Sequence, residues 1–152
     1  MNGFRMESTN VGQYLDDVQN EIIKTDQAVQ RDFCWSTEMI NNIISSAVSQ
    51  KVYIPNLILA EENKEEVTIT YVVDGGHRTE ALRRFKYADY KITSTIRNPI
   101  VTYSKKKLDE NGNIMRDEYD DVIWETEEFD LRNKRYSDLP KELQRQFNKC
   151  PL

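Results

Sequence analysis

The hydrophobic pattern changes at one point near the middle of the chain, and that change constrains the fold more than any other feature. Before Asp74 the stretch "EVTITYVVD" alternates, which predicts a strand. The expected apolar face of this strand comprises Val67, Ile69, Tyr71 and Val73. After Asp74 the spacing becomes helical, with Ala81, Leu82 and Phe85 on the inner side and Arg83 and Arg84 outside. Gly75 and Gly76 therefore lie at a strand-to-helix junction.

Three other segments have helical spacing. "TNVGQYLDDVQNEI" begins with a cap at Thr9 or Asn10, and "SDLPKELQRQFNK" has Pro140 in its first turn and Leu143 and Phe147 four apart. "STEMINNIISSAVSQ" has Ser36 or Thr37 as its cap. Its apolar stripe comprises Met39, Ile40, Ile43, Ile44, Ala47 and Val48.

The remaining segments favour extended structure. "KTDQAVQRDFCW" breaks the helical period, and "VYIPNLILAEE" reads as a strand that pairs with "EVTITYVVD". "KITSTIRNPIVTY" predicts one or two strands, and the Asn-Gly turn in "DENGN" predicts a hairpin that runs into "MRDEYDDVIWE". This order of helices and strands predicts an α+β fold. A chain of 152 residues is the size of one domain, so we expect a single domain over 1–152, and the ending "CPL" suggests a piece of a longer protein.

Composition excludes several classes of protein. No apolar run is long enough to span a bilayer, and the N-terminus lacks a secretion signal, so we expect a cytoplasmic protein with no membrane partner. Cys34 and Cys150 are far apart and predict neither a disulfide framework nor a zinc site. The net charge of -5 argues against a free-standing binder of nucleic-acid phosphates. The charge is uneven, because 117–130 contains eight acidic and no basic residues, as a solvated hairpin edge would.

The junction "DGGHR" has the parts of a phosphate cradle. A helix that starts after glycines presents free N–H groups to an anion, and a glycine backbone can adopt positive φ and let a phosphate approach. Arg78 can donate two hydrogen bonds to phosphate oxygens, His77 can donate or carry a proton, and Asp74 can hold Mg²⁺ or a ribose hydroxyl. The alternative is a tight turn in which Asp74 caps the helix and Arg78 is a surface charge.

A second stretch, "QRDFCW", precedes a predicted helix. Gln30 and Arg31 could reach a nucleotide, and Phe33 and Trp35 could stack on it. For the two aromatic residues the favoured alternative is a role in the core or at the helix entry.

Together these stretches resemble the N-terminal domain of the GmrSD family of restriction-related proteins, within the ParB/sulfiredoxin-like superfamily. "QRDFCW", "MINNIISSAVSQ", "YIPNLIL" and "YVVDGGHRTEAL" occur in the family's order, and "FDLRNKRYSDLPKELQRQF" resembles the segment that follows. The resemblance implies a mixed sheet flanked by helices. The family's DGQQR motif falls on Asp74 to Arg78, with Gly76 and His77 in place of its two glutamines. The segment is also similar to the GxxRxxA motif of ParB proteins at Gly75, Arg78 and Ala81, and to the GGCHR motif of sulfiredoxin without its cysteine.

The resemblance implies a domain that binds a nucleoside triphosphate with Mg²⁺ and regulates DNA cleavage in a restriction or phage-defence system. The implied nucleotide-binding residues are Gln30, Arg31, Asp74, Gly75, Gly76, His77, Arg78 and Thr79. If the domain hydrolyses the nucleotide, Asp74 holds the metal, His77 orients or deprotonates water, and Arg78 with Arg31 neutralises developing charge. The nuclease centre, of HNH type in relatives, cannot lie in a chain with one histidine, so the resemblance implies that DNA is cleaved by a partner or further domain, through which this chain could contact DNA.

Two alternatives belong to other classes. A non-catalytic DNA-binding or adaptor domain of the same fold is favoured by the replaced glutamines and disfavoured by the net negative charge. A sulfiredoxin-like reductase would have to use Cys34, which belongs to the other motif.

Overall fold

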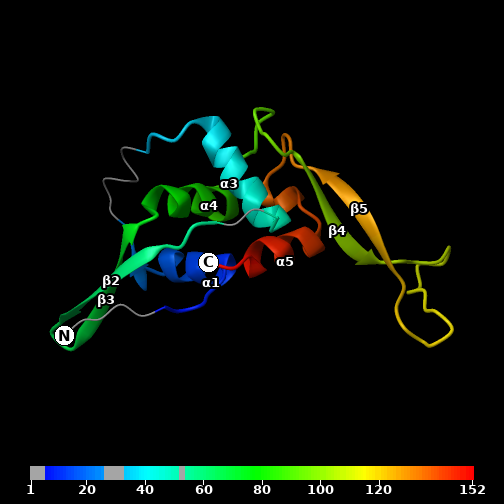
Figure 1. Cartoon of the computed structure of the whole chain (residues 1–152), viewed down its shortest axis with the longest axis horizontal. Coiled ribbons are helices and arrows are strands. Elements are labelled where there is room, and N and C mark those ends of the chain that lie inside the picture. The colour runs from blue at the N-terminus through cyan, green and yellow to red at the C-terminus, as the bar shows by residue number, and fades with distance from the viewer. Residues whose placement is uncertain (1–5, 26–32, 52–53) are drawn as a thin grey trace.

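The structure is a computed structural model that describes residues 6–25, 33–51 and 54–152 (Figure 1). Its α-helices are α1 (Val11–Gln19), α3 (Thr37–Ser49), α4 (Gly76–Tyr87) and α5 (Lys141–Lys149). Its strands are β1 (Ile23–Lys24), β2 (Ile58–Lys64), β3 (Val67–Asp74), β4 (Ile100–Lys106) and β5 (Trp124–Asp130). A short 3-10 helix, η1, spans Tyr136–Asp138. The predicted α+β fold is confirmed.

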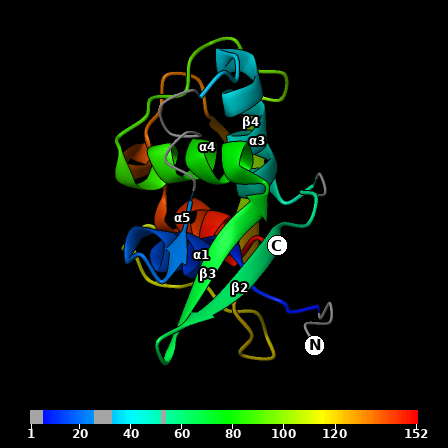
Figure 2. The ribbon, with the colours of Figure 1, turned by 90° about the vertical axis from the view of Figure 1, so that its left-hand side faces the viewer.

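The four α-helices pack together and form most of the core (Figures 1 and 2). Phe85 of α4 and Phe147 of α5 are fully buried and meet edge to face, with ring centroids 5.5 Å apart. Tyr136 completes the aromatic cluster at 5.8 Å from Phe85 and 5.7 Å from Phe147. Burying an aromatic side chain of this size contributes about 2 kcal/mol or more, so this cluster is a main source of stability.

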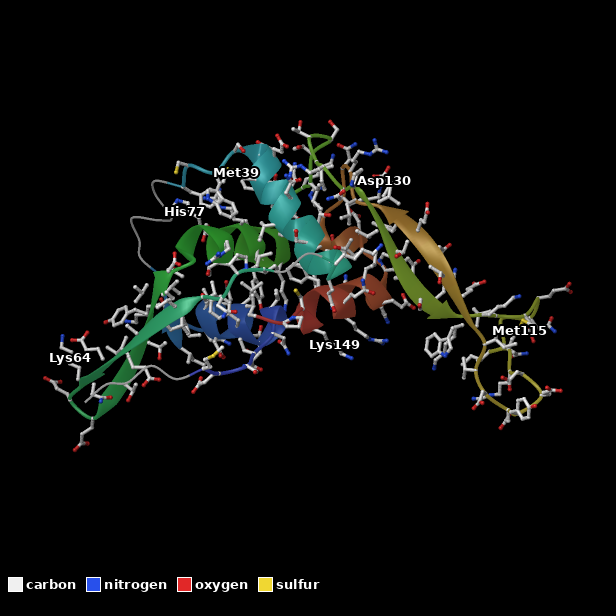
Figure 3. All side chains as sticks on the ribbon, viewed as in Figure 1. Met39, Lys64, His77, Met115, Asp130 and Lys149 are labelled. Atoms are coloured by element: carbon white, nitrogen blue, oxygen red, sulfur yellow. The ribbon has the colours of Figure 1, made fainter. Side chains whose placement is uncertain are left out.

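Local signals locate α1 and α3 correctly. Asn10 caps α1 by accepting a hydrogen bond from the Gln13 N–H, and Ser36 caps α3 by accepting one from the Met39 N–H. The predicted stripe of α3 is buried at Ile40, Ile44, Ala47 and Val48. Met39 is a correction, because its side chain is 47% exposed. It lies in the first turn, at the outer end of the helix (Figure 3).

The first sheet is mixed and has the order β1-β3-β2. β1 runs parallel to β3, and β2 pairs antiparallel with β3 through a turn in which Glu65 and Glu66 have positive φ. The predicted apolar face of β3 is wrong as a core face, since Val67 is 59% and Val73 64% exposed. Val72, from the opposite face, packs against the core instead. The reason is that this hairpin projects from the helices, and at its inner end the core covers the face that carries Val72 and not the face that carries Val73 (Figures 1 and 2).

The second sheet is the antiparallel pair β4 and β5, which projects from the helices away from the first hairpin (Figure 1). Strand structure within 91–103 begins only at Ile100. Ile92 is buried within irregular backbone, and its N–H donates to the Lys134 carbonyl.

The Asn-Gly turn is present, with Gly112 at φ +81° and a bridge between Leu108 and Ile114. The strand expected directly after it is interrupted by a second turn around Asp117, and β5 starts only at Trp124. The acidic segment lies largely at an exposed hairpin edge, as expected.

The last helix, α5, begins at Lys141 with Pro140 in the cap position. Leu143 and Phe147 are both buried, as their spacing predicts. Among the described segments, we find no helix with the length and apolar character that crossing a bilayer requires.

Candidate functional site

The junction between β3 and α4 is built on one strained position. Gly75 lies between the strand and the helix with φ +102°, in the left-handed region that side chains other than glycine rarely adopt. A Cβ at this position would lie 2.2 Å from Cδ2 of Leu57, which is a severe clash. Gly76, by contrast, is the first residue of α4 and does not have positive φ. Of the two glycines, Gly75 is therefore the one whose backbone conformation requires the absence of a side chain.

A chain of buried hydrogen bonds holds this turn from below. The N–H and the hydroxyl of Thr79 both donate to the Gly75 carbonyl, at 2.9 and 2.8 Å. Tyr14 of α1 then donates its hydroxyl proton to Thr79 Oγ1 at 2.8 Å. Burial raises the pKa of Tyr14 to about 12, although the Thr79 hydrogen bond and the Arg78 charge act in the opposite direction. Thr79, predicted to contact a nucleotide, is 1% exposed and supports the turn from inside.

The turn forms one side of a pocket of about 390 Å³. Its lining residues are Trp35, Val72, Val73, Asp74, Gly75, Gly76, His77 and Arg78. The N–H groups of Gly76, His77 and Arg78 begin α4 and have no acceptor within the helix. The pocket therefore combines an apolar wall with backbone donors at the positive end of a helix dipole.

Arg78 lines this pocket and packs against the turn. Its Nη2 donates to the Asn56 carbonyl at 3.2 Å, and the same guanidinium lies 3.0 Å from the point where a Gly75 Cβ would be. Its Nε is buried and has no hydrogen-bond partner among the described residues. A buried donor without an acceptor is costly, so an acceptor bound in the pocket would stabilise this arrangement.

The two sequence motifs meet at His77. Its ring stacks on Phe33 and Trp35, with centroid separations of 5.6 and 6.1 Å, and its Nε2 lies 3.7 Å from Cys34 Sγ. Phe33 and Trp35 are partly buried and pack against the core, as the favoured alternative predicted, and Trp35 also lines the pocket. Gln30 and Arg31 lie outside the described residues, so their predicted role stays a prediction.

A scan against protein-family models matches residues 11–152 to the GmrSD restriction endonuclease, N-terminal domain. The chain belongs to this family. Neither the curated proteins nor the solved structures searched contain a match. The resemblance inferred from the two motifs is thus confirmed at the level of the family, which makes this a restriction-system domain to which DNA is relevant.

In this GmrSD N-terminal domain, Asp74 is exposed at the pocket lining and is not the cap of α4, whose N-cap is Gly75. Within the described ranges, no cluster of three or more His, Cys, Asp or Glu side chains could enclose a metal ion. Mg²⁺ commonly binds through one or two carboxylates together with substrate phosphates. A single carboxylate beside the pocket therefore fits a metal that arrives with a phosphate ligand better than a resident metal.

Sequence reasoning missed Glu80, which organises the basic residues of α4. Its carboxylate is 3% exposed and accepts hydrogen bonds from Arg83 at 2.9 and 2.8 Å and from Arg84 at 2.9 Å. Burial alone would raise the pKa of Glu80, but the two arginines hold it below its ordinary value. Arg83 and Arg84, expected outside, are partly buried, and Arg84 lies 4.3 Å from the centroid of Phe33. The spacing of an acid with arginines three and four residues later was the available signal.

Proposed function

We propose that the pocket at the β3–α4 junction binds the phosphate groups of a nucleoside triphosphate. The observation that carries the proposal is the buried Nε of Arg78, which has no hydrogen-bond partner in the described part of the chain and lies beside a glycine turn that opens a helix. A phosphate oxygen would accept hydrogen bonds both from this guanidinium and from the free N–H groups of the first turn. The close packing of Leu57 and Arg78 on Gly75 keeps these donors in place before a ligand arrives.

The apolar part of the pocket suits the rest of a nucleotide. Trp35 offers an aromatic face, and Val72 and Val73 offer aliphatic surface, on which a base or ribose can pack. Gln30 and Arg31 precede Trp35 by only a few positions in the sequence and are proposed to add polar contacts. Asp74, exposed beside the turn, is proposed to bind either a ribose hydroxyl or Mg²⁺.

Hydrolysis is the second part of the proposal. Mg²⁺, when bound with the nucleotide, would neutralise charge on the phosphates. His77 would accept a proton from the water that attacks the γ-phosphorus, while Arg78 and Arg31 stabilise charge as the bond to the diphosphate breaks. The stacking of His77 against Phe33 and Trp35 restricts its orientation, which favours a fixed role at the pocket.

We propose that nucleotide binding or turnover regulates DNA cleavage carried out by a separate nuclease domain. Support comes from the family, which is a restriction endonuclease family, and from the single histidine of this chain. A nucleotide would then act as a signal that this domain passes to the nuclease.

Isothermal titration with ATP, GTP, CTP and UTP in the presence of Mg²⁺ tests the proposal. We expect one of the four to bind at micromolar to millimolar concentration, and Arg78→Ala to weaken binding at least tenfold, because a charge-assisted contact of about 1.5–3 kcal/mol is lost. His77→Ala should still bind the nucleotide but release phosphate more slowly than the wild type.

The matched control is Arg97→Ala, which removes an arginine whose side chain is 75% exposed on another segment. It should leave affinity unchanged. If Arg78→Ala fails to fold, Arg78→Lys keeps the charge and should bind with intermediate affinity. No binding of any triphosphate at millimolar concentration, or equal binding by wild type and Arg78→Ala, would exclude the proposal.

A further inference from the structure

One face of α5 carries only positively charged residues. Lys141, Arg145 and Lys149 are spaced four residues apart, and all three are exposed. Four residues correspond to slightly more than one helical turn, so the three side chains lie in one row. We call this row the α5 ridge. The labelled Lys149 lies on the side of α5 away from α3 and α4 (Figure 3).

The other polar residues of α5 turn inward. Gln144 donates to the Tyr136 carbonyl, Gln146 to the Val48 carbonyl and Asn148 to the Tyr136 hydroxyl, at 3.0, 2.8 and 2.9 Å. Leu143 and Phe147 are in the core. The uncharged side chains of this helix thus face the protein interior, and the α5 ridge faces outward.

Among the described residues, no acidic side chain is paired with the ridge. Among the residues that the structure describes, none forms an ion pair with Lys141, Arg145 or Lys149, whereas arginines elsewhere are paired with Glu80, Asp130 or Asp89. The one acid of α5, Glu142, lies near Tyr103 of β4. There it adds to the effects of burial and of Glu127 that raise the pKa of Tyr103. Three cations in one row without counter-ions repel one another, and an anionic partner removes that repulsion.

We propose that the α5 ridge binds the phosphate backbone of duplex DNA. The three cations are spaced about 6 Å apart along the helix axis and span about 12 Å. One strand of duplex DNA has about three to four phosphates over the same length of its axis. Each cation can therefore contact a different phosphate. Apolar surface is what the core of a protein interface requires, and α5 contributes none of the large exposed apolar side chains found among the described residues. A phosphate backbone fits this face better than an acidic protein.

The net charge of -5 does not oppose this assignment, because the acidic residues are concentrated elsewhere. The segment 105–130, which forms most of the β4–β5 hairpin, contains ten acidic and four basic residues. The segment 131–152 contains six basic and two acidic residues. DNA can thus approach α5 while the hairpin extends away from it (Figure 1).

This inference does not depend on nucleotide binding. The pocket is built from β3, the start of α4 and Trp35, and includes no residue of α5. In the view of Figure 3, the His77 side chain lies on the upper side of α4, and Lys149 lies below that helix. DNA contact and nucleotide binding can therefore be measured, and can fail, separately.

The test is fluorescence anisotropy of a labelled 30-base-pair duplex titrated with the chain between 50 and 200 mM salt. We expect the wild type to bind, and the variant Lys141→Gln, Arg145→Gln, Lys149→Gln to bind at least tenfold more weakly at 50 mM salt. Its slope of log affinity against log salt should be shallower by about 2.7, since each phosphate contact contributes about 0.9. Glutamine keeps the helix propensity and most of the side-chain length.

The matched control is Lys64→Gln, Lys91→Gln, Lys107→Gln, which removes the same charge from exposed positions on other elements. It should keep the wild-type slope. An equal loss in both variants would show that total charge alone matters and would overturn the proposal, as would no binding by the wild type at 50 mM salt. If the ridge variant unfolds, Arg145→Gln alone should still lower the slope by about 0.9, and an unchanged slope there would also overturn it. Nucleotide titration of the same variants should be unaffected.

Discussion

At the scale of single residues, the β3–α4 turn depends on Gly75 for two independent reasons. Its φ of +102° excludes most side chains, and its distance from Leu57 leaves no room for even a methyl group. Gly112 shares the positive φ, at +81°, but no described atom lies within 4 Å of where its Cβ would be. A side chain at Gly112 would therefore cause backbone strain alone, whereas a side chain at Gly75 would cause both strain and steric crowding.

Gly75→Ala should therefore destabilise the fold more than Gly112→Ala. We expect about 1–2 kcal/mol for Gly112→Ala from backbone strain alone, and about 3 kcal/mol or more for Gly75→Ala. Urea denaturation of both variants measures the difference. Equal losses would mean that Leu57 moves aside without cost and that crowding does not fix the turn.

At the scale of elements, α1 and α4 are joined by the hydrogen bond between Tyr14 and Thr79. Tyr14 is 2% exposed and donates to the Thr79 hydroxyl, which in turn donates to the Gly75 carbonyl. A helix near the N-terminus thus supports a turn that follows it by about sixty residues in sequence. The raised pKa of Tyr14 makes this contact sensitive to alkaline pH.

Tyr14→Phe should change stability in opposite directions at neutral and at alkaline pH. At pH 8 we expect the variant to be about 1 kcal/mol less stable than the wild type, because its hydrogen bond to Thr79 is lost. The tyrosine of the unfolded chain loses its proton above about pH 10, while the folded one holds it to about pH 12. The free energy of unfolding of the wild type should therefore fall by roughly 2–3 kcal/mol between pH 10 and pH 12. That of Tyr14→Phe should not show this fall.

Urea midpoints at pH 8, 10 and 11 measure this effect. The control is Tyr119→Phe, at a side chain that is 77% exposed, and its stability should follow that of the wild type. Parallel curves for the wild type and Tyr14→Phe would contradict the expectation.

The sequence predicts elements whose signals are local. Ser36 and the stripe from Ile40 to Val48 define α3 by capping and period, and the change of period at Asp74 locates the turn. The buried face of β3 was not predictable, because apolar residues occur on both faces and the position of the helices decides between Val72 and Val73. Ile92 was also missed, since it lies outside strand structure and its backbone pairs with Asn133 and Lys134, about 40 residues away.

In the candidate site, too, the local signals were predictable and the contacts between distant residues were not. Asp74 to Arg78 could be selected from the chain because glycines, a histidine and an arginine follow a strand directly. The contact of Trp35 with His77, the packing of Leu57 on Gly75 and the hydrogen bond from Tyr14 join residues far apart in sequence. No local pattern carries such information, and only the family resemblance placed "QRDFCW" and "DGGHR" in one site.

At the scale of the whole molecule, a helical core carries two hairpins that project from it (Figures 1 and 2). The end of the β4–β5 hairpin, 108–122, contains no buried residue. The core by contrast depends on a few large side chains such as Phe85 and Phe147. Stability is therefore concentrated in the helices.

Replacing 108–122 by an Asn-Gly turn should cost less than about 1 kcal/mol. Lys107 and Ile123, which the turn would join, are already paired through the Lys107 N–H and the Ile123 carbonyl. Urea denaturation of the shortened chain measures this loss of stability. The comparison variant is Phe147→Ala, which should lose about 3–5 kcal/mol. A loss as large as that of Phe147→Ala would show that the hairpin end is part of the folding unit. Nucleotide affinity should be unchanged.

The separation of the acidic β4–β5 hairpin from the basic helix α5 also gives this part of the domain an electric dipole. Near a long polyanion, such a dipole experiences a torque as well as a net force, and the torque acts before contact is made. The domain would turn its α5 side toward the polyanion and its β4–β5 hairpin outward. Because screening limits this effect to about 10 Å at 0.1 M salt, orientation occurs only in the last step of an encounter.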